Sequence, residues 1–176
     1  MPVTEPYTAA FEALRDTLVS AGSGNPFVDD NQVMFHIPQV DDEQTPLKLL
    51  AQRLTQNPGT PYALVTDGGS TFTYERGDLD AEELWKVTLF YGVRTPGGDK
   101  DTLRSFSGVD NEYFGEFEIR KWIIDRISMQ DTPSTGTVFR FELQSREVRS
   151  TNSRALLIGA FEMEASLIHT YSAVGG

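Results

Sequence analysis

Two glycine-containing segments carry the residue types in this 176-residue chain that could do chemistry. The first is DGGS at 67–70, which lies between two runs of β-branched and aromatic residues, 62–66 and 71–75. A phosphate-binding loop needs its glycines between a strand and a helix N-terminus, usually with a lysine nearby, and a nucleophilic serine needs a G-x-S-x-G context. DGGS has neither. Asp-Gly and Gly-Gly are typical of tight turns with positive φ, so the segment predicts the tip of a hairpin over 62–75.

A protruding hairpin tip is a place where another molecule can dock. We therefore expect Asp67, Gly68 and Gly69 to be contact residues rather than catalytic ones. On this interpretation, replacing Asp67 by alanine leaves the fold intact and affects docking alone, whereas replacing Gly68 and Gly69 with valine damages the turn.

The second glycine segment is TPGGDK at 95–100. No serine or threonine follows Lys100 directly, and the segment opens a long connection over 95–112 instead of a helix. Long connections in compact domains are usually functional or mobile, so we expect an exposed loop. Asp99 and Lys100 are then docking candidates and not phosphate ligands.

The histidines and acidic runs do not match the sequence pattern of a catalytic or metal site. The two histidines, His36 and His169, have no carboxylate at a spacing that indicates a Ser-His-Asp site. The acidic runs at 29–31 and 41–43 lack the alternating ligands, glycine and final glutamate of a calcium loop. A glycosidase carboxylate pair would require tertiary geometry that a sequence does not reveal. We therefore predict no catalytic residue, no metal and no cofactor.

Composition narrows the class of protein. The chain has no cysteine, which excludes disulfides and thiolate sites, and its 26 acidic and 15 basic residues give a net charge of −11. Such a charge repels duplex nucleic acid, and the nearest basic grouping, Arg146, Arg149 and Arg154, is interrupted by Glu147. The N-terminus lacks the basic region of a signal peptide, and no apolar run is long enough to span a membrane. We expect an intracellular protein, or part of a particle assembled inside a cell.

Two helices are predicted in the first 60 residues. An apolar face recurs at Tyr7, Phe11, Leu14 and Leu18, and Gly22 and Gly24 follow it. A second helix begins at Thr45-Pro46, an N-cap followed by proline, and ends at Asn57-Pro58-Gly59; its apolar residues are Leu47, Leu50 and Leu54. The segment 25–44 between them is expected to be a long loop around a short strand-like core at 32–37.

From residue 62 the apolar period changes from 3.6 to 2, which indicates strands. Segment 84–94 is the clearest strand, with alternate residues on one apolar face: Trp85, Val87, Leu89, Tyr91 and Val93. Further strands are predicted at 138–143 and at 154–171, the latter as one long strand or a bent pair. In that last segment Phe161, Met163, Ala165 and Leu167 share a face.

A central helix is predicted over 113–129, after which 131–136 is a turn. Its apolar residues cover most of the circumference, which indicates burial against a sheet and contact with a second surface such as a neighbouring subunit. Phe114, Phe117 and Trp122 are the expected interface residues. Together the elements predict a single α+β domain over 1–176, with a mainly antiparallel sheet on which the N-terminal and central helices pack.

The order of these elements resembles the tail-terminator, or tail-completion, proteins of long-tailed bacteriophages. The resemblance spans about residues 4–171 and rests on an N-terminal helix, a proline-led strand, an acidic spacer, a tryptophan-bearing strand, a central helix and a late strand. In this chain these are TAAFEALRDTLVSAG, TPYALVTDGG with STFTYE, GDLDAEEL, WKVTLFYGV, EFEIRKWIIDRI and LLIGAFEMEASLIHTY. Segments 25–57 and 95–112 depart from the simplest pattern and leave open a neck or tail-tube relative.

The resemblance implies a structural virion protein without enzymatic activity. Its copies would form a ring, a homohexamer, that caps the tail tube, ends tail polymerisation and contacts a head-completion, connector or neck protein. DNA would pass through the lumen without specific binding, and the protein would reside in the virion after assembly in the host cytoplasm. Two alternatives stay open: a small acidic module that binds a host protein, and a hydrolase with a dispersed carboxylate and histidine site.

Overall fold

The computed structural model describes residues 6–36, 45–74, 80–94, 113–128, 139–143, 149–153 and 156–170. Within these ranges the helices and strands are α1 (Pro6–Leu18), η1 (Asp30–Gln32), β1 (Val33–His36), α2 (Pro46–Gln56), β2 (Tyr62–Tyr74), β3 (Asp80–Arg94), α4 (Glu116–Ser128), β4 (Phe139–Leu143), β5 (Arg149–Ser153) and β6 (Leu156–Thr170). The predicted loop over 95–112 and the turn at 131–136 lie outside the described residues.

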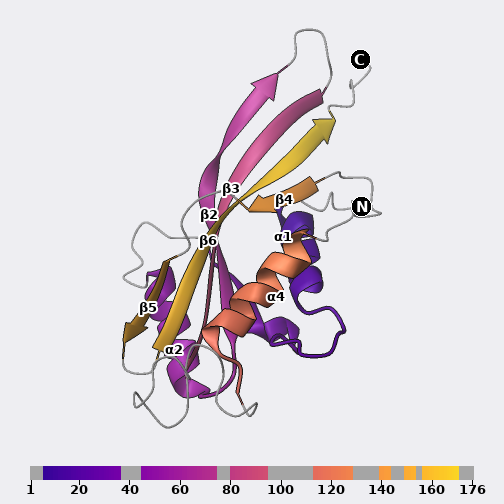
Figure 1. The fold of residues 1–176 in the computed structure, drawn as a ribbon. Helices are drawn as coiled ribbons and strands as arrows, with labels where there is room; N and C mark the ends of the chain where they lie inside the picture. Colours follow the sequence, from indigo (N-terminus) through magenta and orange to yellow (C-terminus); the bar gives the residue numbers. More distant parts are fainter. Residues whose placement is uncertain are drawn as a thin grey trace.

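One mixed sheet forms the centre of the described chain (Figure 1). Its strand order is β1-β2-β3-β6-β4, and β5 also pairs with β6. Every pairing is antiparallel except that of β1 with β2, which is parallel. The predicted α+β class with a mainly antiparallel sheet is therefore confirmed.

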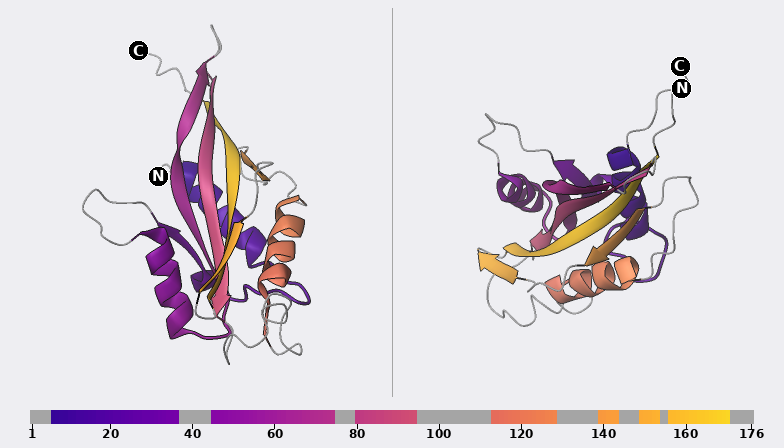
Figure 2. Two further views of the ribbon diagram at one scale, coloured as in Figure 1. Left: turned by 60° about the vertical axis from the view of Figure 1, so that its left-hand side comes forward. Right: turned by 90° about the horizontal axis from the view of Figure 1, so that it is seen from above.

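The main core lies between the sheet and the helices α1 and α4. Ala10, Leu14 and Leu18 on α1 are fully buried, as are Ile119 and Ile123 on α4. They form one cluster with the inward side chains of β2, β3 and β6. Figure 2 shows α1 and α4 on one side of the sheet and α2 on the other.

The helix α2 covers the opposite face of the sheet at its lower end. Thr45 caps it by accepting a hydrogen bond from the Lys48 amide at 3.3 Å, and proline follows as predicted. Leu50 and Leu54 are buried, whereas the predicted core residue Leu47 is 46% exposed. The helix therefore buries a narrower apolar face than its leucine spacing indicates.

The strand faces agree with the predicted alternation. The five inward residues of β3 that were predicted are all buried, and so are Phe161, Met163, Ala165 and Leu167 of β6. The two strands pair over their whole length, from Asp80 opposite Thr170 to Arg94 opposite Leu156. This long pairing fixes the relative positions of the β3 and β6 side chains described below.

The predicted hairpin at 67–70 is wrong. β2 runs without a break from Tyr62 to Tyr74 and pairs with β3 throughout, so the chain reverses after residue 74. The register shifts at DGGS, where Asp67 lies opposite Val87 and Ser70 lies opposite Trp85. One extra residue is thus accommodated as a β-bulge, and the positive φ of Gly69 (87°) serves the bulge rather than a turn.

Beyond the bulge the three central strands continue past the helices as a projecting arm (Figure 1). We define the arm as residues 70–74 of β2 with the paired residues 80–85 of β3 and 165–170 of β6; its lower part contacts α1 through Glu83 and Trp85. Thr71, Phe72 and Thr73 in the arm are all exposed. On the side of β2 away from β3, β1 pairs only with residues 63–66, and no other described strand pairs there.

Candidate functional site

A cavity of about 560 Å³ lies where the N-terminal half of α1 meets β1 and the bulge of β2. Its size is in the range of small-molecule or side-chain binding pockets. We call it the α1–bulge pocket. The lining residues come from α1, β1, β2 and β3: Tyr7, Thr8, Phe11, Glu12, Arg15, Phe35, Asp67, Gly69, Ser70 and Trp85.

Aromatic rings form one wall of the α1–bulge pocket. Tyr7 meets Trp85 edge to face with ring centroids 5.4 Å apart, and Phe35 meets Trp85 in the same manner at 6.1 Å. Phe11 lies against Phe35 at 5.1 Å. Trp85 is 2% exposed, whereas Tyr7, Phe11 and Phe35 are half-buried. The wall is therefore anchored in the core at one end and open toward the cavity at the other.

Asp67 of the bulge is tied to this wall. Its Oδ1 accepts a hydrogen bond from Trp85 Nε1 at 2.7 Å and another from the Gly69 amide at 3.1 Å. The bulge thus turns a carboxylate toward the aromatic rings and fixes its orientation. Asp67 and Gly69, predicted as contact residues, do lie together at one surface hollow, although not at a hairpin tip.

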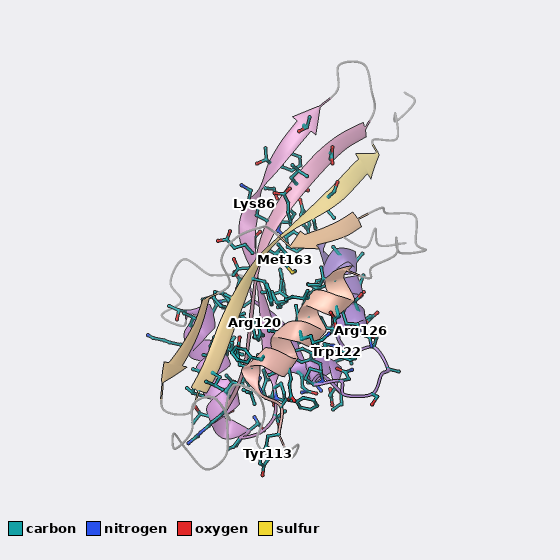
Figure 3. The ribbon with its side chains drawn as sticks, viewed as in Figure 1. Lys86, Tyr113, Arg120, Trp122, Arg126 and Met163 are labelled. Carbon is teal, nitrogen blue, oxygen red and sulfur yellow. The ribbon has the colours of Figure 1, made fainter. Side chains whose placement is uncertain are left out.

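Gly68 faces a different hollow. It lines a smaller cavity of about 250 Å³ with Lys86, Glu162 and Glu164, on the side of the sheet away from α1. Figure 3 labels Lys86 and Met163 in this central part of the sheet. A Cβ on Gly68 would lie 2.9 Å from the Lys86 carbonyl oxygen, so glycine here permits a close approach between two backbones.

A second carboxylate lies behind the aromatic wall. Glu83, on the inward face of β3, is 1% exposed and accepts hydrogen bonds from the Tyr7 hydroxyl at 2.9 and 2.7 Å through its two oxygens. The sequence held a signal for it, because Glu83 lies two residues before Trp85 and therefore on the same strand face. It connects α1 to the base of the arm.

Arg15 is the basic residue of the pocket lining. Its Nε lies 3.7 Å from an Asp16 oxygen and 4.0 Å from an Asp30 oxygen, which are long ion-pair distances. That Nε is buried and makes no hydrogen bond. Its guanidinium carbon lies 5.9 Å from the Phe11 ring centroid, a cation–π distance.

The other predicted interface residues lie away from this pocket. Phe117 on α4 is 44% exposed and Phe114 just before α4 is half-buried. Trp122 is turned inward, since its Nε1 donates to the Leu18 carbonyl of α1 at 3.0 Å and its ring stacks with Arg126 at 4.1 Å (Figure 3). The structure does not bring these three together with the bulge, and Asp99 and Lys100 lie outside the described residues.

Arg120 of α4 takes part in a buried polar cluster that sequence reasoning missed. Glu116 is fully buried, and its Oε1 accepts from the Tyr91 hydroxyl at 2.5 Å and from Arg120 Nη2 at 2.6 Å. Its Oε2 has no hydrogen-bond partner. Glu116 and Arg120 have the i,i+4 spacing of an ordinary surface pair, so the sequence did not indicate burial.

Burial has a clear electrostatic consequence for this cluster. Desolvation first, and then the hydrogen bond to Glu116, raises the pKa of Tyr91 far above its usual range. Burial lowers the pKa of Arg120, but its bonds to Tyr91 and Glu116 outweigh this and the net pKa is raised. The cluster therefore holds a neutral phenol beside a charged pair, an arrangement that fixes α4 to β3.

The structure places the two histidines on different strands and the first acidic run at η1. His36 is in β1 and His169 is in β6, with β2 and β3 between them in the sheet. Asp29 caps η1 by accepting from the Asn31 amide, so the first acidic run has a local structural role. The run at 41–43 lies outside the described residues. No group of three or more potential metal-ligating side chains occurs among the residues that the structure describes.

Comparison with models of known protein families gives no match for this chain, and comparison with curated proteins gives no significant match. No helix in the described ranges is long and apolar enough to cross a membrane.

Proposed function

We propose that this chain is a structural virion protein whose copies form a ring that caps the tail tube of a long-tailed bacteriophage. The ring, a homohexamer, ends tail polymerisation and joins the tail to a head-completion, connector or neck protein. DNA passes through its lumen without specific binding. The element order supports this proposal, because α1, β2, β3, α4 and β6 follow one another as in the family that the sequence resembles.

The open edge of the arm is the observation that carries the proposal. Residues 70–74 of β2, STFTY, contain neither a charged residue nor a proline. Soluble proteins usually place charged residues or prolines on edge strands to prevent pairing with other chains. Within the described chain no strand pairs with this edge, and we propose that a neighbouring copy contacts it.

A ring requires a particular kind of contact. A surface that pairs with its own copy closes as a dimer, whereas a ring forms when one surface meets a different surface of the next subunit. The upper end of the arm extends beyond the helices, which suits a surface that reaches a neighbour (Figure 1). The proposed contact is therefore between the β2 edge of the arm and another face of the next copy.

Native mass spectrometry and negative-stain imaging of the purified protein, alone and with tail-tube protein, test the proposal. We expect closed rings for the native chain. Lysine at Thr71 and Thr73 together should abolish them, because charged side chains on an edge strand oppose its contact with another chain and would lose their hydration there. The matched control carries lysine at Gln52 and Gln56, two exposed positions of α2, and should still form rings.

Three outcomes argue against the proposal. A native protein that stays monomeric at high concentration, and forms no ring with tail-tube protein, removes the basis for a terminator role. A closed dimer indicates self-pairing of the edge instead of a ring. Equal loss of rings in the α2 control means that added positive charge, and not the edge, is responsible.

The α1–bulge pocket favours a second candidate function, an acidic module that binds another protein. Its aromatic wall and fixed carboxylate are the kinds of groups that recognise a side chain. No arrangement of the described residues specifically favours a hydrolase.

A further inference from the structure

Three features of the α1–bulge pocket together indicate the chemistry of an occupant. The first is the wall itself. The faces of aromatic rings carry negative potential and attract cations. The chain already places one guanidinium on this wall, that of Arg15 over Phe11 at 5.9 Å, and the rings of Tyr7, Phe35 and Trp85 line the same cavity.

The second feature is an available carboxylate oxygen. Both hydrogen bonds of Asp67 that hold it in place go to Oδ1, from Trp85 Nε1 and from the Gly69 amide. Its Oδ2 receives no hydrogen bond from the described residues, and the side chain lines the cavity. A carboxylate fixed through one oxygen and open at the other is ready to accept a charged donor at little cost in side-chain entropy.

The third feature is the local charge. Glu12 and Asp67 line the pocket, and Asp16 and Asp30 lie beside Arg15. The pocket lining thus holds two carboxylates, Glu12 and Asp67, and one guanidinium, that of Arg15. The whole chain adds to this field with its net charge of −11. The lining therefore carries a net negative charge, which favours a positive guest.

We propose that the α1–bulge pocket binds an arginine side chain presented by a basic segment of a partner protein. A planar guanidinium stacks on aromatic faces and points N–H donors at a carboxylate in the same plane, which a lysine ammonium does less well. The guanidinium lies against the aromatic wall and donates to Asp67 Oδ2. This inference stands on the pocket alone and does not require ring formation.

The two tryptophans of the chain provide the measurement. In a ¹H–¹⁵N NMR spectrum each indole N–H gives its own signal, and a Trp122→Phe variant assigns them. The Trp85 signal reports on Asp67 directly, because its N–H donates to that carboxylate. Trp122 donates to the Leu18 carbonyl instead, so its signal is an internal control.

The probe is arginine blocked at both ends, titrated against the native protein. We expect a saturable shift of the Trp85 signal and no shift of the Trp122 signal. Blocked citrulline has the same shape without the charge and should bind roughly tenfold more weakly or worse. Asp67→Asn keeps an acceptor for Trp85 while placing an amide at the Oδ2 position, and should weaken arginine binding to a similar extent. Asp125→Asn removes the same charge from α4 and should bind as the native protein does.

Each contrary result overturns the proposal. Citrulline binding as tightly as arginine shows that charge is not recognised. An unchanged affinity in Asp67→Asn removes the carboxylate from the site. A Trp85 shift with blocked glutamate but not arginine assigns the pocket to an anionic guest held by Arg15. Dissociation of a homo-oligomer by the arginine probe places the occupant in a second copy of this chain.

Discussion

The Oδ1 atom of Asp67 links the β-bulge of β2 to the aromatic wall of the pocket. Because Trp85 is 2% exposed, its indole N–H has no access to bulk water and depends on Asp67 Oδ1. The sequence predicts the inward face of Trp85 from strand alternation. It does not predict this acceptor, since Asp67 and Trp85 are 18 residues apart and the register that joins them depends on the bulge.

Replacing Asp67 by alanine is expected to destabilise the protein, contrary to the effect that a hairpin tip would have. The change leaves the indole N–H of Trp85 buried without an acceptor, which costs about 1–3 kcal/mol. Urea unfolding, followed by tryptophan fluorescence, measures it.

Asp67→Asn is the control for this change, because its amide oxygen still accepts from Trp85. It should stay within roughly 1 kcal/mol of the native protein. If alanine and asparagine have equal effects on the free energy of unfolding, the hydrogen bond contributes nothing and the loss has another cause.

Tyr91 is expected to make the fold sensitive to alkaline pH. Its folded-state pKa is raised by burial and by Glu116, so folding favours the protonated phenol. That stabilisation is complete below the unfolded pKa of about 10 and is lost as pH rises above it, by up to about 1.4 kcal/mol per pH unit. Tyr91→Phe removes the titrating group and should flatten this part of the stability curve.

Urea unfolding of the native protein and of Tyr91→Phe, at several pH values on both sides of the unfolded pKa, tests the expectation. The comparison between the two proteins cancels the titration of lysines and of the other tyrosines. Parallel curves for the two proteins would show that Tyr91 does not titrate differently on folding.

At the scale of elements, the β-bulge divides β2 into two parts with opposite alternation. Before it, the odd-numbered Ala63 and Val65 are in the core; after it, Ser70 lies opposite inward Trp85. Without the extra residue the side chains of residues 70–74 in β2 would all move to the other face of the sheet. The same four letters, DGGS, satisfy a hairpin turn and a bulge equally well. Only pairing with β3, distant in sequence, decides between them.

The helices and the interior strands β3 and β6 were predictable for a physical reason. The ends of α2 are determined by neighbouring residues, Thr45 with Pro46 at one end and Asn57 at the other. Because these signals involve residues close in sequence, the sequence alone predicts them. The alternation of β3 and β6 is likewise local. The α1–bulge pocket was not predictable, because it combines segments that are 60 residues apart.

The bulge itself is testable through Gly69. Alanine at this position meets no atom within 4 Å but must adopt a φ of 87°, so it should cost about 1–2 kcal/mol through backbone strain. Gly24 is a matched control, since its φ is 78° and its surroundings are also open. Equal losses for Gly69→Ala and Gly24→Ala in thermal unfolding indicate strain alone.

A larger loss at Gly69, accompanied by a shift of the Trp85 indole signal, indicates that the bulge geometry also holds Asp67 in place. No measurable loss at Gly69 would mean that the bulge relaxes without that φ. In that case the positive φ is not what keeps the bulge in β2.

At the scale of the whole molecule, net charge opposes the proposed ring, whereas the uncharged edge of the arm would favour it. Each copy carries −11, so neighbouring copies repel one another, whereas the exposed edge at 70–74 is uncharged. If the proposed ring holds through this edge, added salt should strengthen it. Between about 0.01 M and about 1 M salt the screening length falls from about 30 Å to about 3 Å, which removes most of the repulsion.

Sedimentation velocity across this range of ionic strength measures the effect. We expect the fraction of assembled protein to rise with salt at constant protein concentration. A fall would indicate that ion pairs between subunits hold the assembly, and would argue against the uncharged edge as the contact.

The position of β6 has a consequence for synthesis of the chain. It is the last described strand, yet it lies in the interior of the sheet between β3 and β4, and it also pairs with β5. Pairing from Asp80–Thr170 to Arg94–Leu156 cannot be completed until the C-terminal part has left the ribosome. Until β6 has emerged, the sheet is incomplete and the edge of β3 that β6 will pair with is exposed. The nascent chain can complete the sheet only after residue 170 has left the ribosome, and during that interval the exposed edge favours binding by chaperones.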